Sequence, residues 1–257
     1  MSGYRLDLRA PLEARVDLSG ITPAALGQLG AGEAAYLSVP CGARRVALGD
    51  LFDVILTSSD GLVIAGDTRL DFVGAGLEAG EIRVEGPVGA LAGAGMTGGV
   101  LVIEGDAGDD LASDLKGGRI TVSGSAGARL GCAAFGERTG MRGGVVEVKG
   151  HVGPHLSERM RGGLVLVGGD AGPDAAFGFV AGTVAVAGRL GPGAGRGMKR
   201  GTLLLAQEPE TPAAGVVDNG PHDLVALALL SRRVPEIAAL FGGTLSGRVS
   251  RRVGDLL

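Results

Sequence analysis

The feature that most constrains this fold is a nineteen-residue period. Seven glycines that end successive segments lie 19, 19, 26, 19, 19 and 19 residues apart: Gly80, Gly99, Gly118, Gly144, Gly163, Gly182 and Gly201. A nineteen-residue unit has room for one strand but not for an additional helix. Because such a unit cannot bury its own apolar face, it must stack on its neighbours. The sequence therefore predicts a repeat architecture.

Each unit has the same internal plan. It opens with a short alternating segment, as in Ile82/Val84 and Ile120/Val122, which is typical of a half-buried strand. Glycine recurs at unit positions 6 and 9, and a large apolar residue recurs at position 16. The position-16 residues are Leu77, Met96, Leu115, Met141, Met160, Phe179 and Met198, and they include every methionine except the initiator. We expect them to form an interior column, where flexible methionine fills irregular gaps well.

These observations predict an all-β fold, a single-stranded parallel β-helix (solenoid) of about seven coils. Strands stacked about 4.8 Å apart would make a rod roughly 34 Å long. The chain has 50 glycines but only 3% aromatic residues, and glycine at fixed unit positions suits corners that need positive φ or a close backbone approach.

The two ends of a solenoid need caps, because they would otherwise expose strand edges. We predict an irregular N-terminal cap over 1–56, the β-helix over 57–206, and a C-terminal cap over 207–257. A degraded repeat is expected at 43–61. Within the caps we expect a short helix after Thr22-Pro23, an apolar helix over about 221–241, introduced by Asn219-Gly220-Pro221, and a strand within Thr244 to Leu257.

Composition and charge exclude several classes of protein. A net charge of −4 argues against a general nucleic-acid binder. There is no apolar stretch long enough for a membrane span and no signal-peptide pattern, so we expect a cytoplasmic protein. The two cysteines, Cys41 and Cys132, have no CxxC spacing and are expected to be free thiols.

The motifs that carry chemistry elsewhere have structural explanations here. Gly93 to Gly98 matches GxGxxG, but a strand follows it where a dinucleotide site needs a helix. His151 and His155 are separated by Gly153-Pro154, which disfavours the helix that a metal pair would need. Asp106, Asp109, Asp110 and Asp114 are expected to form a solvated acidic corner. We therefore predict no catalytic, cofactor-binding or metal-binding residue in this chain.

The one irregular coil, 119–144, carries seven extra residues. Insertions in solenoids become surface loops that often form binding faces. The exposed candidates are Phe135, Arg138 and Arg142, and an apolar ring beside two guanidinium groups suits a contact with another protein. A tolerated surface insertion is the alternative interpretation.

Laid out as GxxGxxxxxxMxGGxIxVxG, the repeat resembles the GXGXG β-helix shared by the C-terminal domain of glutamate synthase and the C subunit of formylmethanofuran dehydrogenase. The segments 48–54 and 66–68 and the segment 251–256 are similar to the entry and C-terminal segments of that C subunit. These flanks favour the formylmethanofuran dehydrogenase C-subunit family.

The resemblance implies a right-handed β-helix that acts as a non-catalytic scaffold in a multi-subunit enzyme. In its bacterial form, the formyltransferase/hydrolase complex, the enzyme moves a formyl group from tetrahydromethanopterin to a methanofuran-type carrier and releases formate. Zinc, the carrier and the catalytic residues then lie in hydrolase-like, transferase-like and dehydrogenase-like partner chains. Three alternatives remain open: the C subunit of a CO2-reducing formylmethanofuran dehydrogenase, a glutamate synthase-like accessory module, and a free-standing β-helix enzyme.

Overall fold

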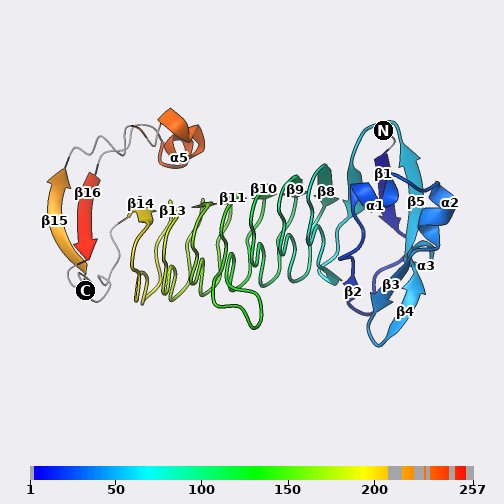
Figure 1. Cartoon of the computed structure of the whole chain (residues 1–257), viewed down its shortest axis with the longest axis horizontal. Helices are drawn as coiled ribbons and strands as arrows, with labels where there is room; N and C mark the ends of the chain where they lie inside the picture. The colour runs from blue at the N-terminus through cyan, green and yellow to red at the C-terminus, as the bar shows by residue number, and fades with distance from the viewer. Residues whose placement is uncertain (1–2, 208–215, 223–228, 230–231, 243–246, 253–257) are drawn as a thin grey trace.

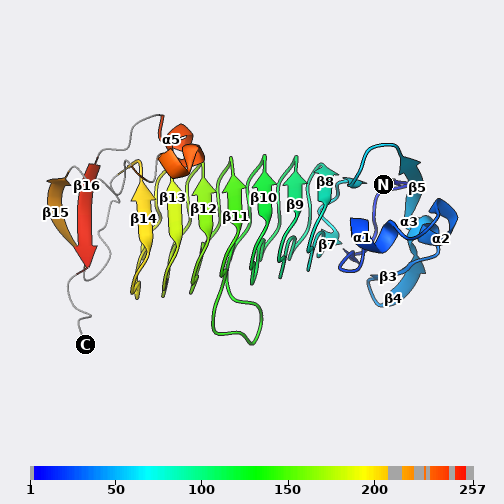
Figure 2. The same ribbon diagram turned by 45° about the horizontal axis from the view of Figure 1, so that its top comes forward.

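One ten-stranded sheet runs along the solenoid and into the N-terminal end, in the order β14-β13-β12-β11-β10-β9-β8-β6-β1-β5 (Figures 1 and 2). The computed structural model describes all residues except 1–2, 208–215, 223–228, 230–231, 243–246 and 253–257. Among the described residues, no helix combines the length and the apolar character needed to cross a bilayer.

Eight strands of this sheet are parallel and come from successive coils. They are β6 (Leu62–Ala65), β8 (Glu81–Glu85), β9 (Val100–Ile103), β10 (Arg119–Val122), β11 (Val145–Val148), β12 (Leu164–Val167), β13 (Thr183–Val186) and β14 (Thr202–Leu205). The register follows the sequence period, since Ile120 pairs with Leu101 on one side and with Val146 on the other. The predicted all-β parallel solenoid is confirmed.

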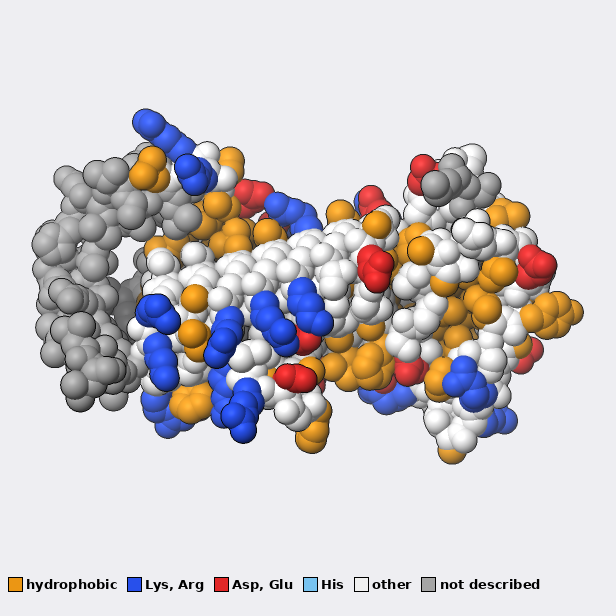
Figure 3. Space-filling model, viewed as in Figure 1, with side chains coloured by type: hydrophobic (Ala, Val, Ile, Leu, Met, Phe, Trp, Pro, Cys, Tyr) orange, Lys and Arg blue, Asp and Glu red, His pale blue; other side chains and the backbone are white. Residues whose placement is uncertain are grey.

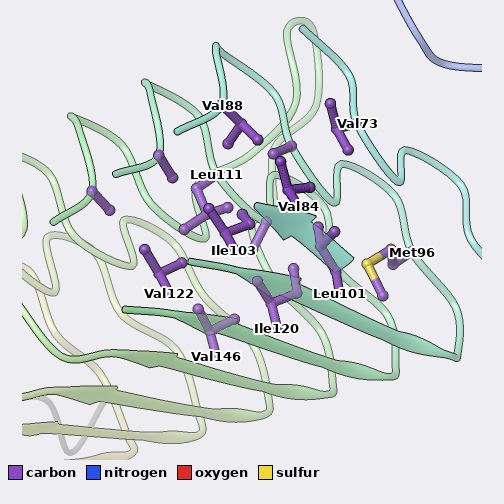
Figure 4. Close-up of a cluster of buried hydrophobic side chains, with 14 of the residues drawn as sticks. Val73, Val84, Val88, Met96, Leu101, Ile103, Leu111, Ile120, Val122 and Val146 are labelled. Atoms are coloured by element: carbon purple, nitrogen blue, oxygen red, sulfur yellow. The ribbon is translucent and has the colours of Figure 1, made fainter. Parts of the chain in front are cut away.

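The core is a continuous apolar filling inside the coils (Figure 4). Alternate strand residues such as Ile120 and Val122 are fully buried, as the alternating pattern predicted. Six of the seven position-16 residues are at most 2% exposed. Met198, in the last complete coil, is only partly buried and packs against the same core. Burial in this column therefore depends on having a coil on both sides.

The N-terminal end consists of short elements around a second sheet of order β4-β3-β2-β7. The elements are β1 (Gly3–Leu8), β2 (Val16–Asp17), α1 (Pro23–Leu26), α2 (Ala31–Ala35), β3 (Ser38–Cys41), β4 (Arg44–Ala47), α3 (Leu48–Leu51), β5 (Phe52–Thr57) and β7 (Leu70–Asp71). Helix α1 is the one expected after Thr22, whose hydroxyl accepts the Ala25 N–H at 3.2 Å.

The expected repeat at 43–61 is wrong. Strand β5 lies antiparallel to β1, and β1 is the strand that stacks in parallel on β6. The apolar alternation of Phe52 and Val54 identified a half-buried strand, but alternation carries no information about strand direction. The cap is also less irregular than expected, because most of its residues belong to short helices and strands.

The C-terminal end has a separate antiparallel pair, β15 (Val216–His222) and β16 (Gly247–Arg252). The strand expected within 244–257 is therefore present, although 244–246 and 253–257 lie outside the described residues. The helix expected from 221 is wrong at its start, because Pro221 and His222 belong to β15, where a bulge follows Asp218. A bulge accommodates the Gly-Pro turn signal within a strand.

Helix α5 (Pro235–Leu240) is the described part of the expected C-terminal helix that packs on the solenoid. Its Ile237 is fully buried against Leu166 of β12 and Ala185 of β13, on the outer face of the sheet (Figure 2). The Arg119 guanidinium lies 2.8 Å from a Glu236 carboxylate oxygen. These contacts explain why two outward-facing strand residues are buried.

Candidate partner interface

The seven extra residues of coil 119–144 leave the solenoid as a protruding loop beside β11 (Figures 1 and 2). The Met141 N–H bonds to the Gly131 carbonyl at 2.9 Å, which closes the base of the loop, and the Arg142 N–H rejoins the regular ladder at the Leu115 carbonyl, 2.7 Å away. Phe135 in the loop is fully exposed. The insertion therefore displays its phenyl ring to solvent while leaving the stack of coils intact.

Unit position 17 forms an exposed basic column next to this loop. Lys116, Arg142, Arg161 and Lys199 occupy it in four coils, with Val180 between the last two. The backbone N–H of each bonds to the position-16 carbonyl of the preceding coil, which fixes their stacking. Figure 3 shows a row of Lys and Arg side chains along the rod. The sequence motifs pointed only to Arg142, although Arg161 and Lys199 follow it at whole multiples of nineteen residues.

Acidic neighbours balance only one end of the basic column. The Asp114 carboxylate, whose side chain is 15% exposed, lies 3.3 Å from the Lys116 ammonium and 2.8 Å from the Arg142 guanidinium. Arg161 and Lys199 have no ion-pair partner among the described residues. Arg142 and Arg161 lie on adjacent coils outside the strands, and their like charges repel each other. An acidic surface placed against the column would relieve this repulsion.

Several polar side chains of the repeat lie at unit position 7 and have the same structural role. Each side chain accepts the backbone N–H of the same position one coil later, at 2.7 to 3.1 Å. The acceptors in order are Asp106, Ser125, His151 and Asp170. His151 is thus part of a backbone-capping ladder, and its Nδ1 is occupied as an acceptor.

The acidic corner is likewise built into the ladder. Asp109 accepts the Ala128 N–H at 2.7 Å, and Asp110 pairs with Arg129. His155 faces Glu158 at 3.2 Å. Within the described part of the chain, no three His, Cys, Asp or Glu side chains are grouped so that they could hold a metal ion.

Both cysteines are free and buried. Cys132 lies at the base of the loop and donates its thiol hydrogen to the His155 carbonyl, with sulfur and oxygen 2.9 Å apart. Burial raises the pKa of the Cys132 thiol to about 12. The thiolate is the reactive form, so this cysteine is structural and not a nucleophile.

We expect Cys132 to resist alkylation in the folded chain. A thiol with a pKa of about 12 is about one part in 10⁴ thiolate at pH 8. Iodoacetamide labelling at pH 8, read by peptide mass spectrometry, should be at least about 100-fold slower at Cys132 in native protein than in urea-unfolded protein. If Cys132 is labelled as fast as in unfolded protein while the circular dichroism spectrum is that of the native fold, its buried position is contradicted.

Comparisons with known proteins were made on sequence and on structure. No family model matches the chain. An 85-residue stretch is 52% identical to the C subunit of the formyltransferase/hydrolase complex Fhc from Methylorubrum extorquens and covers 33% of this chain. That match spans about a third of the relative's length, 32%.

A solved structure resembles nearly the whole chain. It is a chain in the X-ray crystal structure of the formyltransferase/hydrolase complex FhcABCD from Methylorubrum extorquens in complex with methylofuran. The similarity has a TM-score of 0.89 and 43% sequence identity, and it covers 98% of this chain and 95% of that chain.

Proposed function

Because the chain belongs to the C-subunit family of formyltransferase/hydrolase complexes, we propose that it is a non-catalytic scaffold subunit of such a complex. The complex would transfer a formyl group between tetrahydromethanopterin and a methanofuran-type carrier in the cytoplasm and release formate. The observation that carries this proposal is the 43% identity along 98% of the chain with a chain of the methylofuran-bound complex.

The polar side chains of the solenoid support a scaffold role. The described aspartates and histidines at positions 7, 10 and 11 are engaged in the backbone ladder or in ion pairs. A zinc ion needs three or four converging ligands, and the described residues offer no such group. We assign zinc and the carrier to partner chains.

The partner-facing surface is the loop together with the basic column. Phe135 would bury its ring on docking, since aromatic residues dominate interface energetics. Arg138 beside it and the column from Arg142 to Lys199 would face an acidic surface of a partner protein. The excess of arginine over lysine, 21 to 3, suits two-pronged contacts with carboxylates.

The test is purification of the tagged chain from its native cells, with identification of the co-purifying proteins and an assay of formate release. We expect hydrolase-like and transferase-like partners, activity in the assembly, and none in the isolated chain. Turnover by the isolated chain would contradict the non-catalytic role. A tungsten- or molybdenum-pterin partner would select the dehydrogenase alternative, and a glutamine amidotransferase would select the glutamate synthase alternative.

A further inference from the structure

Strand β5 is the outer edge of the ten-stranded sheet at its N-terminal end. Its neighbour β1 points alternate backbone groups to its two sides: the Tyr4 N–H bonds to Gly61 next to β6, and the Arg9 N–H bonds to Leu51, just before β5. The odd-numbered residues of β1, Arg5 among them, therefore direct their backbone N–H and C=O groups toward β5. In the β1–β5 register, Ile55 lies opposite Arg5. Backbone hydrogen-bonding groups alternate in direction along an antiparallel strand. The N–H and C=O of Ile55 therefore point toward β1, and those of its two neighbours in the sequence point away from β1.

Those two neighbours, Val54 and Leu56, present unpaired backbone groups. Among the described residues, neither their N–H groups nor their carbonyls have a hydrogen-bond partner beyond the sheet edge. The backbone N–H of Phe52, which also points away from β1, already has a partner, because it bonds to the Leu48 carbonyl of α3. Two N–H and two C=O groups are thus left as a short template for another strand.

A groove runs along this free edge, with a volume of about 510 Å³. Helix α2 forms its opposite wall and lies beyond β5, away from the solenoid (Figures 1 and 2). The wall is made of small residues, Ala31, Gly32 and Ala35, which leave a space next to the strand.

The surroundings of the groove are apolar and electrically balanced. Five large hydrophobic side chains are strongly exposed among the described residues, and three of them belong to β5 or to the residue that ends α2: Ile55 (44%), Leu56 (48%) and Tyr36 (84%). The charges that line the groove, Arg9 and Asp53, lie 2.8 Å apart and cancel each other. A charged segment would find no counter-charge here, whereas an uncharged apolar segment would lose little on desolvation.

We propose that the β5 edge receives an extended, uncharged segment of a partner chain, which adds to the sheet as a further strand. Main-chain hydrogen bonds to Val54 and Leu56 hold the segment, and its apolar side chains, alternating between the two faces of the sheet, cover Ile55 and Leu56. The occupant is a single segment and not a second copy of this chain. A second copy would have to place its own β1 where α2 lies.

This inference rests on the proposed function only because it requires partner chains. Hydrogen exchange tests the contact at the β5 edge separately from the scaffold role. The tagged full-length chain is studied alone and in the assembly that co-purifies from native cells, with fragmentation to single amides. We expect the Val54 and Leu56 amides to exchange at least ten-fold more slowly in the assembly. The Ile55 amide, already bonded to β1, serves as the internal control and should change little.

Each other outcome overturns the inference. Partner chains present with the Val54 and Leu56 amides unprotected would refute the edge contact and leave the scaffold role standing. Absence of any partner chain would refute both proposals. Protection in an assembly that contains only copies of this chain would show that the occupant is a second copy.

A matched pair of variants tests the same contact. Leu56→Pro removes the outward N–H without breaking a bond to β1, whereas Leu56→Ala removes the side chain and keeps the N–H. We expect Leu56→Pro to lower the yield of co-purified partner at least ten-fold and Leu56→Ala to lower it less. Thermal melts establish that both variants fold, and equal retention of the partner by a folded Leu56→Pro chain would overturn the inference.

Discussion

The double variant Arg142→Glu/Arg161→Glu is expected to bind its partner proteins at least about 30-fold more weakly than the natural chain, because truncating or reversing charges that face a complementary surface costs about 2 kcal/mol or more. Both side chains are exposed, and Arg161 has no ion-pair partner among the described residues. Arg142→Glu also removes the ion pair with Asp114, so a thermal melt of the double variant must first establish that it folds. Measured by titration of immobilised chain with purified partner proteins, the loss should appear mainly in slower association and should shrink at high salt.

The matched control for this surface is Arg189→Glu. Arg189 is also exposed, but it lies at position 7 of its unit and not in the basic column. We expect its partner affinity to stay within about three-fold of the natural chain, since its exposed charge lies outside the basic column and salt screens exposed charges. Equal losses in the two proteins would mean that net charge, and not the column, governs association.

Phe135→Ala tests the apolar part of the same interface. Truncating an aromatic residue that becomes buried on binding costs about 2 kcal/mol or more when it is a hot spot. We expect a slower-associating or shorter-lived complex with an unchanged melting temperature, because the ring contributes nothing to the core of the isolated chain. Unchanged affinity would support a tolerated surface insertion.

Gly118→Ala is expected to destabilise the chain by at least about 3 kcal/mol, because it combines backbone strain with a backbone clash. Gly118 ends a unit and has a φ of +85°. A Cβ there would lie 2.6 Å from the Gly98 carbonyl oxygen of the preceding coil. Neither atom can move without opening the ladder. The melting temperature should fall by roughly 6 to 12 °C, at about 2 to 4 °C for each kcal/mol in a chain of this size.

The control separates the two contributions. Gly95 also has a positive φ, +66°, but a Cβ there would meet nothing within 4 Å. Gly95→Ala should therefore show the strain alone, about 1 to 2 kcal/mol. If the two variants melt at the same temperature, close approach of the coils is not what requires glycine at the end of each unit.

The repeat could be read from the sequence because its signals are local and recur. Gly118, Met141 and Ile120 each stand in a column of equivalent residues, so one unit supports the interpretation of the next. The same logic failed at Phe52–Val54. An apolar alternation without further repeats fits an antiparallel strand as well as a coil, and only the pairing of β5 with β1 decided between them.

One part of the proposed interface could be predicted from the sequence. The extra residues around Phe135 were visible as a break in the period, and the structure places that side chain in a solvent-exposed loop. Arg161 and Lys199 were missed, although they occupy the same unit position as Arg142. The signal was present in the period, because Arg161 and Lys199 lie 19 and 57 residues after Arg142, and 57 is three times nineteen.

The sequence by itself determined that the chain stacks nineteen-residue coils around a column of methionine, leucine and phenylalanine, because each unit has too little apolar surface to fold alone. Only the tertiary structure decided how the ends are finished. Strand β1 returns from the N-terminus to pair with both β5 and β6, and α5 covers Leu166 and Ala185 from far along the chain. Such contacts join residues with no common period, and their energy arises only when the two surfaces meet.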